Sequence, residues 1–204
     1  MHITHGDLPY WHQDDRIIYV TYRLFDSIPA TSAKRYKEAV LSWEESHPKV
    51  LTRQQAEELE QLRHQLFNEL LDKCLGSCIL KHAAVRQVVS DSLFYYNHQR
   101  YHLHDYVIMP NHVHLMIEPM DGYQLQQIMA SHKTFTAHRI NKLLGKTGPV
   151  WQRESYDHIV RSENDYWNVV DYIARNPRYF VSSDYTLYLT NGRPNYQVMQ
   201  NYTI

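Results

Sequence analysis

Two histidines separated by one residue, His112 and His114, carry the clearest chemical signal in the sequence. They lie in the segment 109–117, where apolar residues alternate with them as in a β-strand. Side chains two apart on a strand point to the same face, so the two imidazoles project together while Val113 and Leu115 face a core. Two neutral imidazoles on one face can bind the same divalent metal ion.

The histidine pair alone leaves the metal hypothesis open. Two ligands do not fill a coordination sphere, so a third protein group has to come from elsewhere in the chain. With 14 histidines in 204 residues the spacing also arises by chance, and His102 and His104 repeat it one strand earlier. The alternative is that His112 and His114 are solvent-facing strand residues that bind no metal.

A later helix offers the polar groups that the histidine pair lacks. Tyr172 and Asn176 are four residues apart and therefore neighbours on one helix face. If this face packs against the histidines, Asn176 can complete the metal site and Tyr172 can lie beside it. The alternative is that Tyr172 is one of 17 tyrosines in an amphipathic core helix and that Asn176 only ends this helix before Pro177.

The order of the predicted elements indicates the fold that positions these residues. Strands are expected in four segments, from residue 16 to the turn at 26–29 and over 101–108, 112–118 and 155–160. Helices are expected over 30–46, 52–75, roughly 79–97, 123–144 and 163–175. This order predicts an α+β fold of the ferredoxin-like or RNA-recognition-like kind, with helices on one face of a mostly antiparallel sheet.

The first two helices are expected to form an acidic, Gln-rich helical hairpin inserted after the first strand, over about residues 32–75. Leucines at helical spacing predict that the second of these helices turns a stripe toward the core: Leu59, Leu62, Leu66 and Leu70. The chain is therefore expected to be one domain over 1–204, with this insertion and a short C-terminal tail over about 181–204.

The segment Met-Pro-Asn-His-Val-His at 109–114 resembles the His-hydrophobic-His (HUH) signature of the single-tyrosine DNA transposases. Later segments resemble the REP-associated branch of this superfamily: Val-Trp-Gln at 150–152, Asp-His-Ile-Val-Arg at 157–161, Asp-Tyr at 165–166, Val-Asp-Tyr-Ile at 170–173 and Asn-Pro at 176–177. Because several motifs occur in the same order over about residues 16–180, the resemblance is more specific than any one motif.

This resemblance implies a ferredoxin-like catalytic domain that cleaves and rejoins single-stranded DNA through a 5′-phosphotyrosine intermediate. It implies that His112, His114 and Asn176 are metal ligands and that Tyr172 is the nucleophile. Imidazole and amide oxygen suit Mg²⁺ or Mn²⁺ better than an ion that prefers thiolates. Two alternatives stay open: a non-catalytic nucleic-acid-binding module of the same fold, and a metal-dependent phosphodiesterase that uses water.

Candidate DNA contacts lie on the helix over 123–144 and after it. Lys133, Arg139 and Lys142 can follow the phosphates, and Tyr106 and Trp151 can stack on unpaired bases. The same residues can equally be solvated cations and core aromatics. The expected partner is single-stranded, hairpin-forming DNA, and a homodimer is possible.

Composition gives further expectations. The net charge of −1 provides no general case for binding nucleic acid. No apolar run approaches the roughly 20 residues of a membrane helix, and the first residues are polar, so a cytoplasmic protein without a membrane partner is expected. Cys74 and Cys78 are expected to be free thiols.

Overall fold

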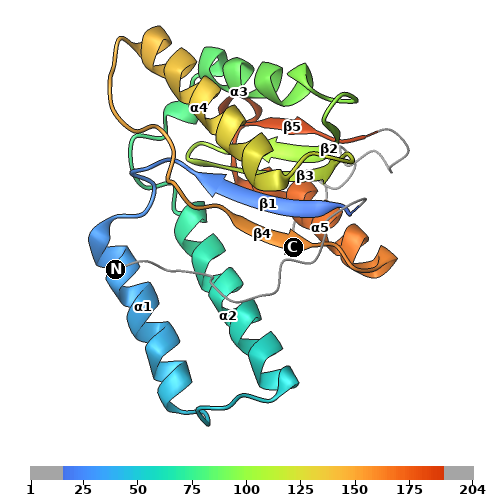
Figure 1. Ribbon diagram of the computed structural model, residues 1–204. Coiled ribbons are helices and arrows are strands. Elements are labelled where there is room, and N and C mark those ends of the chain that lie inside the picture. Colours follow the sequence, from blue (N-terminus) through green and yellow to red (C-terminus); the bar gives the residue numbers. More distant parts are fainter. Residues whose placement is uncertain (1–15, 191–204) are drawn as a thin grey trace.

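Five strands form one antiparallel sheet in the computed structural model, which describes residues 16–190 (Figure 1). The order across the sheet is β4-β1-β3-β2-β5. The strands are β1 (Ile18–Arg23), β2 (Tyr101–Ile108), β3 (His112–Pro119), β4 (Tyr156–Ile159) and β5 (Thr186–Tyr188). The central strand is β3, which pairs with β1 on one side and β2 on the other.

Five α-helices and three short 3₁₀ turns complete the described chain. The helices are α1 (Ala30–Glu45), α2 (Arg53–Asp72), α3 (Ala83–Tyr95), α4 (Leu125–Leu144) and α5 (Glu163–Arg175). The turns are η1 (Ile79–Lys81), η2 (Asn176–Tyr179) and η3 (Ser182–Asp184). A helix between β1 and β2, a β2–β3 hairpin and a helix before β4 give the ferredoxin-like order, so the predicted fold class is confirmed.

Helices cover both faces of the sheet rather than one, so the expectation of a single covered face was wrong. On β1, Ile18, Val20 and Tyr22 belong to the core under α3 and α4, while Tyr19 belongs to a second core on the opposite face. This second face is covered by α5 (Figure 1). An apolar stripe on α5, formed by Val169, Val170 and Ile173, is buried there. Successive side chains of β1 and β3 point to opposite faces of the sheet, and most of them are buried because both faces are covered.

The predicted helical hairpin is present, and α1 and α2 extend away from the sheet (Figure 1). Thr52 begins α2 with a capping box, because its hydroxyl accepts a hydrogen bond from the Gln55 N–H while its own N–H donates to Gln55 Oε1. At the other end of α2, Leu71 is fully buried. The hairpin therefore projects at its tip and is anchored to the body of the molecule where α2 ends.

The helix expected over 79–97 is divided into η1 and α3. His82 separates them because its backbone is extended, with φ −74° and ψ 119°. Both cysteines follow the end of α2 and are free thiols, as the sequence predicted. Among the helices within residues 16–190, none combines the length and the apolar character needed to cross a bilayer.

Part of the expected C-terminal tail is folded, because β5 pairs with β2. The buried Arg86 guanidinium donates hydrogen bonds to the carbonyl oxygen of Ser183 and to Thr186 Oγ1, at 2.7 and 3.0 Å. The Asp105 carboxylate accepts from the backbone N–H and the hydroxyl of Thr190. These bonds tie residues 183–190 to the sheet, whereas the rest of the expected tail, 191–204, lies outside the described residues.

A buried histidine of α4, His132, connects this helix to β1 and α3. Hydrogen bonds join His132 Nε2 to the hydroxyl of Tyr22 and His132 Nδ1 to Ser92 Oγ, at 2.8 and 2.9 Å. Burial, and to a smaller extent the charge of Lys133, lowers the pKa of His132 from 6.5 to about 3. The imidazole is therefore neutral in the folded protein at pH 5, where the same side chain in the unfolded chain is protonated.

We predict that His132 makes folding stability depend on pH. The unfolded chain binds the extra proton between pH 6.5 and about 3, so the free energy of unfolding falls as the pH is lowered through this window. One such group contributes a slope of up to about 1.4 kcal/mol per pH unit. In His132→Gln the amide can bond both neighbours but does not titrate, so the slope should be shallower by about that amount. Urea unfolding between pH 6 and 4 measures this, and an unchanged slope would contradict the assignment.

Candidate functional site

His112 and His114 lie side by side on the central strand, with ring centroids 4.6 Å apart. Both side chains are completely buried, at 0% exposure. In the sheet His114 pairs with Thr21 and His112 with Arg23 on β1. The alternative of two solvent-facing strand residues is therefore wrong.

Each histidine is held by hydrogen bonds to one ring nitrogen. His112 Nδ1 lies 2.7 Å from Asn111 Oδ1. His114 Nδ1 lies 2.7 Å from the Tyr19 hydroxyl and 2.8 Å from Thr21 Oγ1. Burial lowers the pKa of His112 to about 3 and that of His114 well below its usual range. Both rings are thus neutral, which is the state that binds metals.

Helix α5 brings Tyr172 and Asn176 to the histidines. Ser162 caps this helix by accepting a hydrogen bond from the Asp165 N–H, and Asn176 follows its last residue at the start of η2. The Tyr172 and His114 rings are 5.1 Å apart and meet edge to face. The structure therefore brings Tyr172 to the two histidines, and the Asn176 side chain lies next to Tyr172.

Four buried polar atoms in this cluster have no hydrogen-bond partner within the described chain: His112 Nε2, His114 Nε2, the Tyr172 hydroxyl oxygen and Asn176 Oδ1. Buried polar atoms are normally satisfied by protein, water or a ligand, so these four atoms are available to a bound ion or to ordered water. Between residues 16 and 190, no third His, Cys, Asp or Glu joins the pair. An amide oxygen and two imidazoles fit a divalent ion with open positions, so the residues present suit the metal that the sequence implied.

The phenol of Tyr172 is protonated at neutral pH. Burial raises its pKa well above the usual value of 10, the charge of Asp72 raises it further, and the nearby Asn176 and Tyr19 side chains only partly offset this. A protonated phenol is a weak nucleophile. Attack by Tyr172 therefore needs a partner that withdraws charge from the target.

Helix α2 contributes side chains to this site that the sequence reasoning missed. The His64 ring lies 4.9 Å from the Tyr156 ring and 6.1 Å from those of Tyr19 and Tyr172. Asp72, at the end of the same helix, acts on the pKa of Tyr172. The only sequence signal is the spacing of His64, Asn68 and Asp72, which places them on one helix face.

The second histidine pair lies elsewhere. His104 Nε2 is 3.1 Å from Glu118 Oε2, and His102 Nδ1 is 3.1 Å from His98 Nδ1. Both have partners, and neither is among the buried unpartnered atoms of the described chain. His102 is therefore a suitable control position for the metal site.

The residues expected to contact DNA are not equivalent. Lys133 Nζ donates to the carbonyl oxygen of Arg153 at 2.8 Å and to Ser155 Oγ at 3.1 Å, and burial lowers its pKa to about 8. At about 100° per residue, Lys142 lies about 180° away from Lys133 on α4 and about 60° from Arg139. Arg139 and Lys142 are exposed, so only these two can form a shared phosphate surface.

The two aromatic residues proposed to stack on bases belong to the core, so that expectation was wrong. Trp151 is 7% exposed, donates from Nε1 to Thr136 Oγ1 at 2.9 Å and packs edge to face on Tyr22. Tyr106 is also buried and is hydrogen-bonded to Ser90. Both rings are therefore largely withdrawn from solvent.

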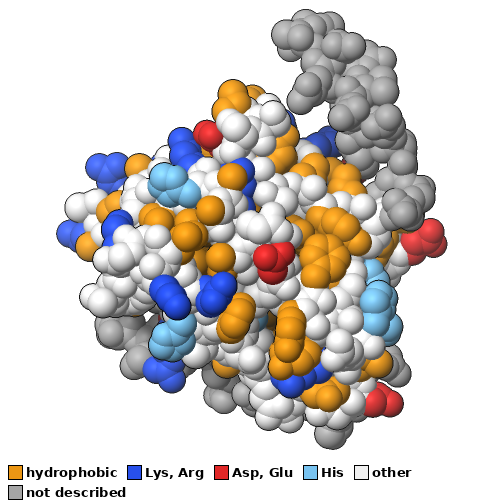
Figure 2. Space-filling model, turned by 90° about the horizontal axis from the view of Figure 1, so that it is seen from above, with side chains coloured by type: hydrophobic (Ala, Val, Ile, Leu, Met, Phe, Trp, Pro, Cys, Tyr) orange, Lys and Arg blue, Asp and Glu red, His pale blue; other side chains and the backbone are white. Residues whose placement is uncertain are grey.

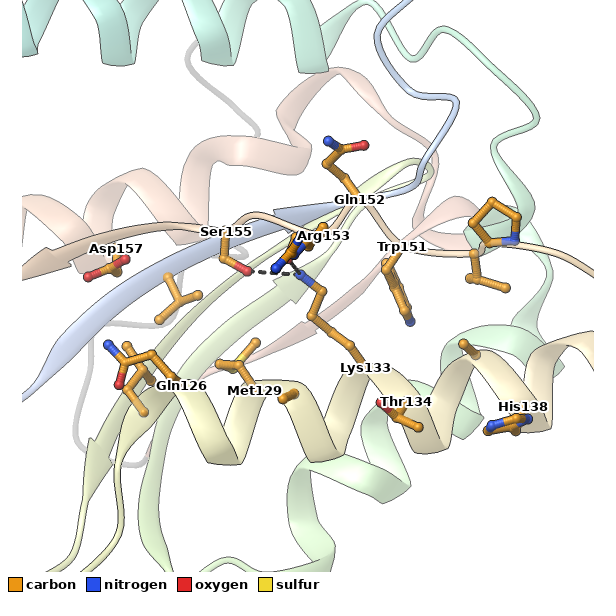
Figure 3. A pocket seen from close by; sticks show the side chains of 16 residues that line it. Gln126, Met129, Lys133, Thr134, His138, Trp151, Gln152, Arg153, Ser155 and Asp157 are labelled. Carbon is orange, nitrogen blue, oxygen red and sulfur yellow. Dashed lines mark hydrogen bonds between the residues drawn. The ribbon is translucent and has the colours of Figure 1, made fainter. Parts of the chain in front are cut away.

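A groove lies between α4 and the segment 149–157 (Figure 3). It is on the sheet face opposite His114, because Val20 of β1 lines the groove whereas its neighbours Tyr19 and Thr21 contact His114. Lys133 reaches across it to Ser155, and Trp151 forms part of the wall (Figure 3). The face seen over α3 and α4 carries Lys and Arg side chains interspersed with hydrophobic ones (Figure 2). The basic residues and the histidine cluster thus lie on different sides of the sheet.

We predict that Arg139 and Lys142, and not Lys133, set the salt dependence of DNA binding. Replacing both with Ala should lower the slope of log affinity against log salt by about 1.4, since each phosphate contact with a single strand contributes about 0.7. Lys133→Met, the control, should leave the slope unchanged because Lys133 is tied to residues 153–155. Fluorescence anisotropy from 50 to 300 mM salt measures this, and a larger change in Lys133→Met would move the DNA path to the groove.

Known proteins resemble part of this chain. A curated relative from Haemophilus influenzae, described as an uncharacterized protein, is 32% identical, and the match covers 36% of this chain and 52% of the relative. The chain thus spans about half the length of that relative. A solved structure of a REP-associated tyrosine transposase bound to a REP hairpin aligns with 85% of this chain and 73% of its own, at 13% identity and a TM-score of 0.43.

A family model also matches. The segment from η1 to Asn176 fits the model described as "Transposase IS200 like", and this segment contains both histidines of β3, Tyr172 and Asn176. The match spans nearly half of the chain. Over residues 79–176 the chain therefore matches the IS200-like transposase family. For this segment, the match confirms the resemblance to the single-tyrosine transposases that the sequence motifs indicated.

Proposed function

We propose that this chain is a transposase that cleaves and rejoins single-stranded DNA, with Tyr172 as nucleophile and a divalent metal held by His112, His114 and Asn176. The observation that carries the proposal is the convergence of four buried, unpartnered polar atoms from these residues in the described chain. The family match over residues 79–176 supports the same reaction class.

The cleavage step uses the residues in separate roles. Mg²⁺ or Mn²⁺ bound to the scissile phosphate would withdraw charge from phosphorus and stabilise the departing 3′ oxygen. The Tyr172 oxygen attacks phosphorus, the bond from phosphorus to the 3′ oxygen breaks, the phenol loses its proton and the 3′ oxygen gains one. The products are a 5′-phosphotyrosine and a free 3′-hydroxyl.

The rejoining step is the reverse displacement. A 3′-hydroxyl from a second strand attacks the phosphotyrosine, loses its proton and releases the Tyr172 phenol. The covalent link conserves the phosphodiester bond, so strand transfer needs no nucleotide cofactor. Because burial raises the pKa of the Tyr172 phenol, the departing oxygen has to gain a proton as its bond to phosphorus breaks.

Incubation of the chain with end-labelled single-stranded hairpin DNA and Mn²⁺, followed by a denaturing gel, tests the proposal. A shifted band that resists denaturation and disappears after protease treatment supports a covalent adduct. Cleavage without an adduct would favour a hydrolytic phosphodiesterase, and retention on a native gel without cleavage would favour a binding module. Hairpin DNA is the probe because the sequence resembles the REP-associated branch.

The proposed partner surface is the exposed pair Arg139 and Lys142. Because it lies on the sheet face away from Tyr172, a bound hairpin would have to send its single strand around an edge of the sheet, or a second copy of the chain would supply the catalytic face. The mass of the DNA complex by light scattering distinguishes one copy from a homodimer.

A further inference from the structure

Asn111 connects the helical hairpin to the metal histidines. Its Nδ2 donates a hydrogen bond to the carbonyl oxygen of Leu71 at 3.1 Å and reaches that of Leu75 at 3.5 Å. Its Oδ1 lies 2.7 Å from His112 Nδ1. Asn111 is completely buried, so both ends of its amide depend on these protein partners.

The chemistry of the partners decides which way the amide faces. A backbone carbonyl oxygen can only accept, so the carbonyls of Leu71 and Leu75 require the amide nitrogen on their side. The amide oxygen is left facing His112, and the Cys74 thiol also points to this oxygen, at 3.9 Å. Because the amide oxygen can only accept, His112 Nδ1 must donate and therefore carries the ring proton.

A neutral imidazole carries one proton, so His112 Nε2 is left with a free lone pair. This is the nitrogen that has no partner among the described residues. We propose that the carbonyl groups of Leu71, in α2, and Leu75, just after it, fix the tautomer of His112 through Asn111, which makes the inserted hairpin a positioning element of the site. The inference rests on the proposed function only in taking His112 Nε2 as a metal ligand.

His114 provides an internal contrast. Its Nδ1 lies between the hydroxyls of Tyr19 and Thr21, and a hydroxyl can either donate or accept. These partners hold the ring in place without dictating which nitrogen carries the proton. The enforced tautomer is therefore specific to His112, the histidine connected to α2.

The tautomer can be read directly from long-range ¹H–¹⁵N NMR spectra of the metal-free chain at pH 7. His112 is expected in the Nδ1–H form, and Asn111→Ala is expected to lose this preference, with an Nε2–H signal. Asn141→Ala is the matched control, because Asn141 donates its amide to the carbonyl oxygen of Gly148 outside the site, and it should leave the His112 signal unchanged. An Nε2–H form of His112 in the unsubstituted chain would overturn the inference without any variant.

Two further measurements separate this role from a general effect on folding. Asn111→Asp keeps an acceptor for His112 but turns a second oxygen toward Leu71, so it should retain the Nδ1–H signal while its melting temperature falls. Mn²⁺ affinity, followed by electron paramagnetic resonance, should decrease about 10- to 100-fold in Asn111→Ala, the range typical for loss of a group that orients a ligand. Affinity equal to that of Asn141→Ala would contradict the proposed positioning.

The inference and the proposed function fail in different ways. A His112 Nδ1–H signal together with an absent covalent adduct would leave the positioning role intact and remove the transposase reaction. An adduct that forms while Asn111→Ala keeps a pure Nδ1–H signal would leave the reaction intact and remove the role of α2.

Discussion

Tyr172→Phe is expected to bind single-stranded DNA and Mn²⁺ like the unsubstituted chain but to form no covalent adduct. The substitution removes only the attacking oxygen and keeps the ring that packs edge to face on His114. Mass spectrometry of the adduct trapped by the unsubstituted chain, after proteolysis, should place the phosphonucleotide on Tyr172. The loss should be complete on a denaturing gel, because the covalent bond forms to the Tyr172 oxygen.

Tyr166→Phe is the matched control on the same helix. Tyr166 is six residues earlier, so it lies about 120° away around the axis from the face that Tyr172 shares with Asn176. It should retain most of the adduct formation. A phosphonucleotide on any other tyrosine, or an adduct that persists in Tyr172→Phe, would show that the nucleophile has been assigned incorrectly.

His112→Ala is expected to abolish Mn²⁺ binding and DNA cleavage while most DNA binding is kept. The substitution removes one of the two imidazole nitrogens that have no partner among residues 16–190, and the remaining imidazole and amide oxygen hold a divalent ion poorly. Calorimetric titration with Mn²⁺ measures the first effect, and the labelled hairpin measures the second. Circular dichroism establishes that the variant is folded.

His102→Ala is the control for this substitution. His102 is on β2, and its Nδ1 is hydrogen-bonded to His98 away from the cluster, so its loss should leave Mn²⁺ binding unchanged. If His112→Ala cleaved DNA at the rate of the unsubstituted chain, the metal site would have to be sought elsewhere.

Local periodicity explains what could be predicted from the sequence. The alternation around His112 and His114 indicates a strand with both rings on one face, and the four-residue spacing of Tyr172 and Asn176 indicates one helix face. These rules predict each pair separately, because they concern neighbours in the chain. The contact between the two pairs comes from the packing of α5 on the sheet. Their chemical roles are predictions that adduct formation and Mn²⁺ binding test.

The features that were missed depend on contacts between distant segments. Nothing near Asn111 in the sequence indicates that its amide meets the end of α2, 40 residues earlier. The three-residue strand β5 is too short to show a period, and it is tied in place by Arg86 from α3. Trp151 was proposed to stack on bases, with core packing as the alternative, because aromatic type alone does not show whether a ring is buried.

The place of β1 in the sheet determines how the chain can be divided. This strand lies between β4 and β3 but precedes the segment that matches the transposase family. A polypeptide trimmed to residues 79–176 would lose it, leaving β4 with no neighbouring strand and one side of β3 with unpaired backbone groups. Exposed apolar strand edges of this kind pair with other chains. The trimmed segment would therefore aggregate, and the smallest unit that can fold reaches from β1 at least to α5.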